Sequence, residues 1–237
     1  MSKTSILILL LMITSFQKEN ESNINIEIFK CPRIIESNKT KLLIRNDTIP
    51  QTANYKLLYV GGYIDTIQLK ADVKLADHRR KRLINVGIDS TALIIKVDTN
   101  QIITEKSVFD FNDNKDKREI FYEAYPVFLF NTQEDTLYIG SGIVLPIKME
   151  ALNKDNQWKV IEQNRFYYCG TGLPKFYLPG NQMFVTSAPK YSGGFKTKLR
   201  LRYKNMTSNE FYGSINLQQF NIESDSIRFN KFMIEEQ

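Results

Sequence analysis

The chain has 237 residues, of which 42% are hydrophobic and 24% are charged, the balance of a globular protein rather than of a disordered chain. Its net charge of +6 would suit an acidic glycan, anionic lipid or nucleic acid, but no nucleic-acid-binding motif accompanies it. One histidine and two distant cysteines exclude the common zinc sites, and His78 lies beside arginines that disfavour its protonation as a catalytic base. We therefore expect no cofactor and no nucleic-acid partner, and we favour a non-enzymatic role.

The N-terminal segment has the layout of a secretory signal peptide. Lys3 supplies a positive charge, residues 6–13 form an uninterrupted apolar run, and the small residues Thr14 and Ser15 precede a polar stretch. The apolar run is shorter than the roughly 20 residues that span a bilayer, and no later stretch approaches that length. We expect residues 1–17 to be a signal peptide and the mature chain, without a transmembrane segment, to reach the periplasm, the cell surface or the medium. The alternative is a buried N-terminal strand or helix.

Short β-prone segments separated by turn residues make up the first half of the chain. The best hairpin candidate covers residues 55–70, where Gly61 and Gly62 can take the positive φ of a tight turn. Other strands are expected at residues 23–28, 41–45, 92–97 and 101–105.

A polar, turn-rich stretch at residues 109–118 marks the expected boundary between a first β-module, 22–108, and a second, 119–237. Pro126 implies a bulge, an edge position or a break, because proline cannot donate to a strand ladder. Strands of the second module are expected at residues 119–131, 136–139, 143–152, 157–162, 195–204, 211–217 and 226–234. No segment after the signal shows a helical apolar period. The pattern predicts an all-β fold, an antiparallel β-sandwich with two immunoglobulin-like modules.

Two features of the second module are candidate sites. In residues 195–204, uncharged and positively charged residues alternate strictly. One face of the expected strand is therefore mainly apolar, and the other carries five cations: Lys196, Lys198, Arg200, Arg202 and Lys204. This basic face could bind a polyanion such as an acidic glycan, or it could be an edge strand charged to prevent aggregation. Nearby aromatics could form a sugar-stacking platform or pack in the core: Phe166, Tyr167, Tyr168, Phe176 and Tyr177.

Cys31 and Cys169 are the two cysteines of the chain, and export would permit a disulfide between them. Such a bridge would close a long loop and stabilise the protein by about 4 to 5 kcal/mol on the chain-entropy model. The alternative is two separate buried thiols that act as small hydrophobic side chains.

Several motifs resemble a pattern found in uncharacterised exported proteins of Gram-negative bacteria. They are a Trp-x-x-Ile-Glu strand at Trp158–Glu162, a Phe-x-x-Cys-Gly loop at Phe166–Gly170 and a basic strand at Lys190–Arg200, where Ser192-Gly193 widens the loop. The Asp65–Ile67 strand and the Val97–Thr99 turn are similar to its first half. The resemblance implies an immunoglobulin-like sandwich and transfers no catalytic residue.

These observations predict an exported, non-catalytic β-sandwich protein that binds or scaffolds an envelope protein or a glycan. Two alternatives stay open. One is a glycan-binding module that uses the aromatic cluster and the basic face. The other is a hydrolase that uses carboxylates alone, because 26 acidic residues are present and no pair stands out.

Overall fold

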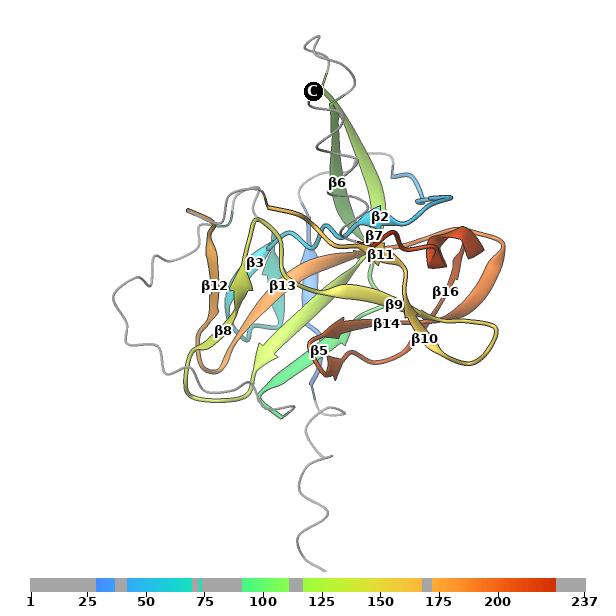
Figure 1. Ribbon diagram of the computed structural model, residues 1–237. Helices are drawn as coiled ribbons and strands as arrows, with labels where there is room; N and C mark the ends of the chain where they lie inside the picture. Colours follow the sequence, from blue (N-terminus) through green and yellow to red (C-terminus); the bar gives the residue numbers. More distant parts are fainter. Residues whose placement is uncertain are drawn as a thin grey trace, which may run out of the picture. The chain divides into compact units, whose positions relative to one another are not determined.

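The computed structural model describes residues 29–36, 42–69, 73, 91–110, 117–167 and 172–224 (Figure 1), with the backbone alone at 107–110 and 117–119. Among these residues no α-helix occurs, and the short 3-10 helix η1 (Leu217–Phe220) is their one helical element. The all-β, antiparallel prediction is therefore confirmed. Several predicted features lie outside the described residues: the signal segment 1–17, the strands at 23–28 and 226–234, His78 and Cys169.

Five antiparallel strands form the first large sheet, here called sheet I. Its order is β3-β13-β7-β5, with β6 also pairing with β7. The strands are β3 (Tyr59–Gly62), β13 (Gln182–Pro189), β7 (Lys117–Asn131), β5 (Leu93–Val97) and β6 (Ile103–Asp110). β6 and the first half of β7 run together as a long hairpin, which Figure 1 shows beside the rest of the sheet.

Pro126 implied a bulge, an edge position or a break, and the structure shows an interrupted ladder on one side of β7, which itself runs on through Pro126. On one side of β7, β5 ends with Val97 opposite Val127, and β6 begins with Ile103 opposite Ala124. The ladder is thus interrupted where Pro126 has no N–H to give. The Pro126 carbonyl still accepts a hydrogen bond from the N–H of Asp98, in the loop that interrupts the ladder.

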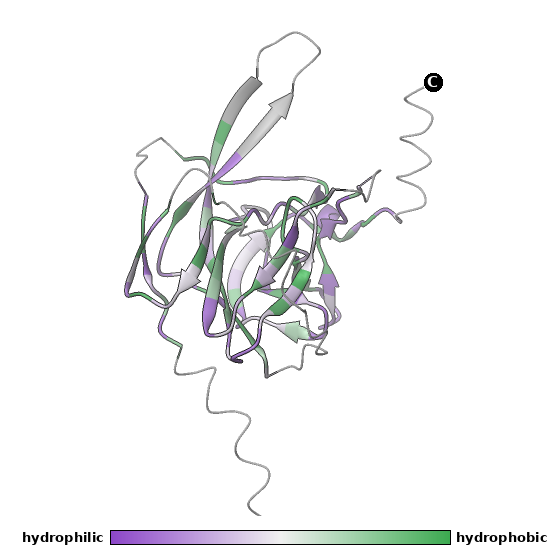
Figure 2. Cartoon of the chain, turned by 90° about the vertical axis from the view of Figure 1, so that its left-hand side faces the viewer, coloured by the Kyte–Doolittle hydropathy of each residue, from purple (hydrophilic) through white to green (hydrophobic). Residues whose placement is uncertain are grey.

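A second antiparallel sheet of five strands, here called sheet II, is built by the C-terminal half of the chain. Its order is β10-β9-β14-β15, with β16 also pairing with β14. The strands are β9 (Lys148–Leu152), β10 (Trp158–Val160), β14 (Phe195–Tyr203), β15 (Met206–Thr207) and β16 (Phe211–Ile215). Figure 2 shows hydrophobic and hydrophilic segments interspersed along the strands of the chain. In β14 the alternation is clearest, and one face of this strand buries Leu199, Leu201 and Tyr203.

Three short strand pairs complete the described structure. Two of them are parallel and one is antiparallel. The parallel pairs are β1 (Arg33–Ile35) with β4 (Thr66–Gln68) and β2 (Gln51–Thr52) with β11 (Glu162–Gln163), and the antiparallel pair is β8 (Leu137–Ser141) with β12 (Lys175–Leu178).

The predicted hairpin at residues 55–70 is wrong. Gly61 and Gly62 lie inside β3, which pairs with β13, and the return segment, β4, pairs in parallel with β1. A glycine pair permits a tight turn but does not require one, and here the strands find partners far away in the sequence. Residues 42–45 likewise make isolated bridges, Leu43 with Tyr122 and Arg45 with Tyr191, instead of a continuous strand.

Strands from both sides of the predicted module boundary share sheet I. β3, β5 and β6 come from the range 22–108, whereas β7 and β13 come from 119–237. One buried cluster also draws on both ranges, from Ala53 and Tyr55 to Phe211 and Ile215. Of the polar stretch expected at the boundary, residues 109–110 belong to β6 and residues 117–118 to β7, and residues 111–116 lie outside the described residues.

Candidate binding groove

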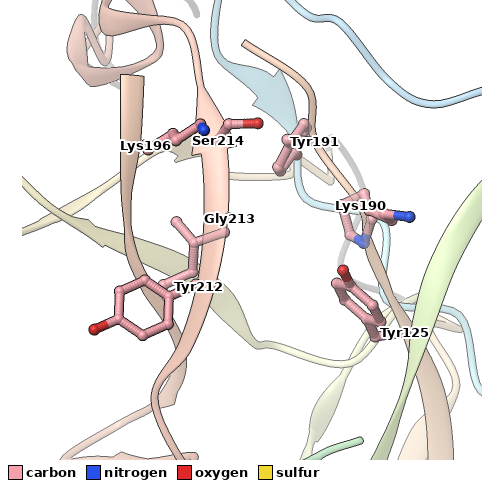
Figure 3. A pocket seen from close by; sticks show the side chains of 9 residues that line it. Tyr125, Lys190, Tyr191, Lys196, Tyr212, Gly213 and Ser214 are labelled. Atoms are coloured by element: carbon pink, nitrogen blue, oxygen red, sulfur yellow. The ribbon is translucent and has the colours of Figure 1, made fainter. Parts of the chain in front are cut away.

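A pocket of about 330 Å³ opens where sheet I and sheet II meet along one side (Figure 3). One wall comes from the middle of β7, the end of β13 and the residues after β13, and the other wall comes from β14 and β16. The lining residues are Tyr125, Pro189, Lys190, Tyr191, Lys196, Leu199, Tyr212, Gly213 and Ser214. We call this pocket the groove. It contains three tyrosines and two lysines, and none of its lining residues is acidic.

The two lysines of the groove differ in their partners. Lys190 Nζ lies 2.6 Å from Glu123 Oε2, and this hydrogen bond raises the pKa of Lys190 above its usual value. Lys196 is exposed on β14, and no carboxylate of the described residues forms an ion pair with it. Lys196 is therefore the cation of the groove that a ligand can engage without displacing a partner.

The aromatic walls are held at different depths. Tyr212 is 77% exposed, while the Tyr125 ring packs edge-to-face on Phe211 with the ring centroids 5.8 Å apart. Between the walls, Gly213 packs directly on Leu199, because a Cβ at this position would lie 2.4 Å from Leu199 Cδ1. The groove thus combines one exposed ring with one packed ring and an apolar floor.

Tyr191 connects the groove to a buried carboxylate. Its hydroxyl donates to Glu162 Oε1 at 3.2 Å, and the hydroxyl of Tyr55 donates to Glu162 Oε2 at 2.7 Å. The N–H of Met149 also donates to Oε2, at 2.8 Å. Burial raises the pKa of Glu162 to about 6, although these three hydrogen bonds and the charge of Arg45 oppose the rise. Burial and the Glu162 charge raise the pKa values of both tyrosines well above 10, so their hydroxyls stay protonated and donate.

A buried ion cluster lies on the other side of the Tyr191 ring. Arg45 is 7% exposed, and its guanidinium lies 5.8 Å from the centroid of that ring. Its Nη1 donates to Glu105 Oε1 at 3.3 Å, and its Nε is 2.9 Å from Asp47 Oδ2. Burial raises the pKa values of Glu105 and Asp47 despite the opposing charge of Arg45. Tyr191 therefore contacts both Glu162, a buried carboxylate, and Arg45, a buried guanidinium that already has two carboxylate partners.

The buried acids do not reach the groove. Glu105 is 4% exposed and Glu162 is 2% exposed, and neither lines the pocket. A carboxylate that acts on a glycosidic bond must contact the substrate. Within the described residues, no group of three His, Cys, Asp or Glu side chains gathers as a metal site would require.

Four of the five cations of the predicted basic face lie on one side of β14, whereas Lys204 lies in the turn after it, and their partners differ. Glu150, buried on β9, binds both Arg200 and Arg202, with its Oε2 2.8 Å from Arg200 Nε. Arg200 also lies over the ring of Trp158, 4.1 Å from its centroid. Lys198 pairs with Glu210 at 2.8 Å. Three of the five cations thus have carboxylate partners within the chain, and polyanion binding by the face stays a prediction.

The alternative that the basic strand is an edge strand is wrong. β14 pairs with β9 on one side and with β16 and β15 on the other, so it is interior to sheet II. Sequence alternation identifies a face of a strand but carries no information about its neighbours in the sheet.

The residues of the predicted aromatic platform do not share one environment. Phe176 and Tyr177 are buried, which confirms the core interpretation for both, and Tyr168 lies outside the described residues.

The predicted disulfide is not tested by the described structure, because Cys169 lies outside it. Cys31 is partly buried. Titration of thiols in protein isolated without reductant would decide the matter.

Sequence reasoning missed the residues around Tyr191. Arg45 appeared as the end of a strand, and Glu162 as the end of a motif. The sequence held one signal: Val160 and Ile161 are adjacent apolar residues, so the period-two alternation of the strand slips at this point, and in the structure Ile161 and Glu162 are both buried. A slip that turns a carboxylate inward indicates a buried polar contact.

Comparisons with known proteins give no relative: no family model, no curated protein and no solved structure matches the chain. The resemblance to exported Gram-negative proteins therefore stays a prediction. Within the described residues, no helix has the length and apolar character needed to cross a bilayer.

Proposed function

We propose that this is an exported, non-catalytic binding protein of the cell envelope, and that its groove binds an acidic glycan. The observation that carries the proposal is the lining of the groove: three tyrosines and two lysines with no acidic residue. Tyrosine rings offer apolar faces to the C–H surface of a sugar, and the hydroxyls of Tyr125 and Tyr212 can bind its oxygens, whereas that of Tyr191 is held by Glu162. An exposed lysine without a carboxylate partner favours a ligand that brings the negative charge itself.

The proposed architecture is a β-sandwich of immunoglobulin-like type. Sheets I and II are both antiparallel, and residues of both contribute to a single buried cluster. The groove is lined by strands of both sheets, so its shape depends on how the two sheets pack. The signal-like segment at residues 1–17 supports export, which would place the groove where envelope glycans are found.

A non-catalytic role is preferred over a carboxylate-dependent hydrolase. Hydrolysis of a glycosidic bond needs two carboxyl groups beside the substrate, about 5 to 10 Å apart. The groove offers tyrosine, lysine and serine side chains instead, and the buried pair Glu105 and Glu162 is already bound by Arg45, Tyr55 and Tyr191.

A binding assay on immobilised glycans tests the proposal directly. We expect the purified protein to bind acidic glycans more strongly than neutral glycans of equal length, with an affinity that falls as salt rises. Tyr212→Ala and Lys196→Glu should each weaken binding by about tenfold or more, because removal of a central aromatic or charged contact usually costs over 1 kcal/mol.

The matched controls change residues of the same kind outside the groove. Tyr63→Ala removes another exposed tyrosine, and Lys159→Glu reverses an exposed lysine on β10. Both should bind as the wild type does. Equal binding of neutral and acidic glycans, or equal binding by Lys196→Glu and Lys159→Glu, would contradict the proposal. The export part has its own test: mass spectrometry of the mature protein should locate a cleavage close to residue 17.

A further inference from the structure

A second, smaller pocket lies between the end of β8, the start of β9 and the segment after β11. Its volume is about 140 Å³. A water molecule occupies about 30 Å³ of liquid, so this pocket holds one small ion with a few waters rather than an oligosaccharide. The lining residues are Ala53, Ser141, Val144, Leu145, Pro146, Ile147, Lys148, Asn164, Arg165 and Tyr167. Lys148 and Arg165 are the charged residues among them, and both are cations.

Arg165 is anchored in a way that leaves most of its donors available. Its Nε–H donates to the carbonyl oxygen of Ala53 at 3.4 Å, which fixes the guanidinium at the pocket wall. No carboxylate of the described residues forms an ion pair with Arg165 or with Lys148. A guanidinium has five N–H donors in a planar fork that matches the oxygens of a carboxylate or phosphate.

Tyr167 adds a third donor. Its hydroxyl oxygen accepts a hydrogen bond from the N–H of Ile143 at 3.1 Å, so its own proton is left to donate. The ring can lie here because residue 142 is glycine: a Cβ on Gly142 would be 2.4 Å from the Tyr167 hydroxyl, and the φ of 145° is one that glycine tolerates. The chain thus places two cations and a hydroxyl donor around a cavity large enough for one small ion.

We propose that this pocket is a binding site for a single small oxyanion, either a tetrahedral phosphate or sulfate group or a planar carboxylate. Donors outnumber acceptors among its charged and hydroxyl groups, and an oxyanion supplies the acceptors that the pocket lacks. Val144 and Leu145 add buried apolar side chains to the lining, and an apolar lining strengthens the electrostatic attraction. The site is independent of the groove, since the two pockets share no lining residue.

Isothermal titration calorimetry tests the site with three probes: inorganic phosphate, sulfate and acetate, each at constant ionic strength set with chloride. We expect at least one of them to bind saturably at one site per chain. A response to phosphate and sulfate alone identifies a tetrahedral anion, and a response to acetate alone identifies a carboxylate. Arg165→Gln and Lys148→Gln should each weaken that binding by about tenfold or more, since each removes a charged hydrogen bond.

Lys159→Gln is the control, because it removes an exposed lysine of β10 that lies outside the pocket. It should bind the probe as the wild type does. If Arg165→Gln does not fold, the Lys148→Gln variant tests the proposal, because it leaves the hydrogen bond from Arg165 to Ala53 intact. The proposal is overturned if no probe binds the wild-type protein, or if the three variants bind equally, as expected for non-specific attraction to a basic surface.

Discussion

Replacement of Glu162 by glutamine should change how the stability of the protein depends on pH. The carboxyl group is buried, and its pKa is about 6 in the folded protein against 4.5 for the unfolded chain. The folded state therefore binds the proton more tightly. This contribution to stability is complete below pH 4.5 and is lost as the pH rises through 6. A difference of one unit between the folded and unfolded pKa corresponds to about 1.36 kcal/mol, so the stability lost between pH 4 and pH 7 is about 2 kcal/mol.

Glutamine has no proton to lose in this range, so the variant should lack this contribution. We expect the free energy of unfolding of Glu162→Gln, relative to the wild type, to rise by about 2 kcal/mol from pH 4 to pH 7. Its absolute value at either pH also contains the change in the bonds from Tyr55 and Tyr191, but that term cancels in the pH dependence. Glu105 and Asp47, whose pKa values burial also raises, are present in both proteins and cancel too.

Urea unfolding, followed by circular dichroism at pH 4, 5, 6 and 7, measures this difference. Glu134→Gln is the matched control, because it changes an exposed carboxylate in the turn after β7, and it should follow the wild type at every pH. A difference between Glu162→Gln and the wild type that is constant within about 0.5 kcal/mol would refute the reasoning. A difference of opposite sign would mean that the hydrogen bonds to Glu162 outweigh its burial.

Two further predictions concern stability. Gly213→Ala should destabilise the protein by about 1–3 kcal/mol in thermal or urea unfolding, because the new Cβ would lie 2.4 Å from the buried Leu199 side chain. Gly194→Ala, where a Cβ meets nothing within 4 Å, is its control, and an equal cost for both would contradict the packing argument. Glu150→Gln should cost about 1.5–3 kcal/mol because it removes a buried carboxylate that binds two arginines. Glu210→Gln, at an exposed ion pair, should cost at most about 1 kcal/mol, and the reverse order would count against the assignment.

Whether a strand could be predicted from the sequence depended on whether one or both of its faces are buried. β14 has one buried and one polar face, so its period of two is visible in the sequence and its inward residues were predicted correctly. β13 was not predicted, although it pairs with both β3 and β7. Seven of its eight residues are buried, so no polar face alternates with the apolar one. Pro179, Gly180 and Pro189 flank or end it, and no strand was expected between residues 162 and 195.

Strand pairing was harder to predict than strand position. The partners of β3 and β4 lie far from them in the sequence, and local turn chemistry therefore pointed to the wrong pair. The same limit applies to both pockets, whose walls come from segments that only the sheets bring together. Of the groove residues, the predicted basic face includes Lys196, whereas Tyr125 and Tyr212 appeared only as members of strands.

The position of Tyr191 gives a structural role to the buried charged residues beside the groove. Ordinary packing would favour apolar residues at Arg45, Glu105 and Glu162, since a buried ion pair rarely stabilises a protein more than well-packed hydrophobic side chains do. These polar groups instead hold one ring in place from two directions: Glu162 accepts from its hydroxyl, and Arg45 lies against its face. Hydrogen bonds and cation–π contacts fix orientation in a way that apolar contacts do not. The cluster therefore costs stability above pH 6 and gives the groove a wall of defined geometry.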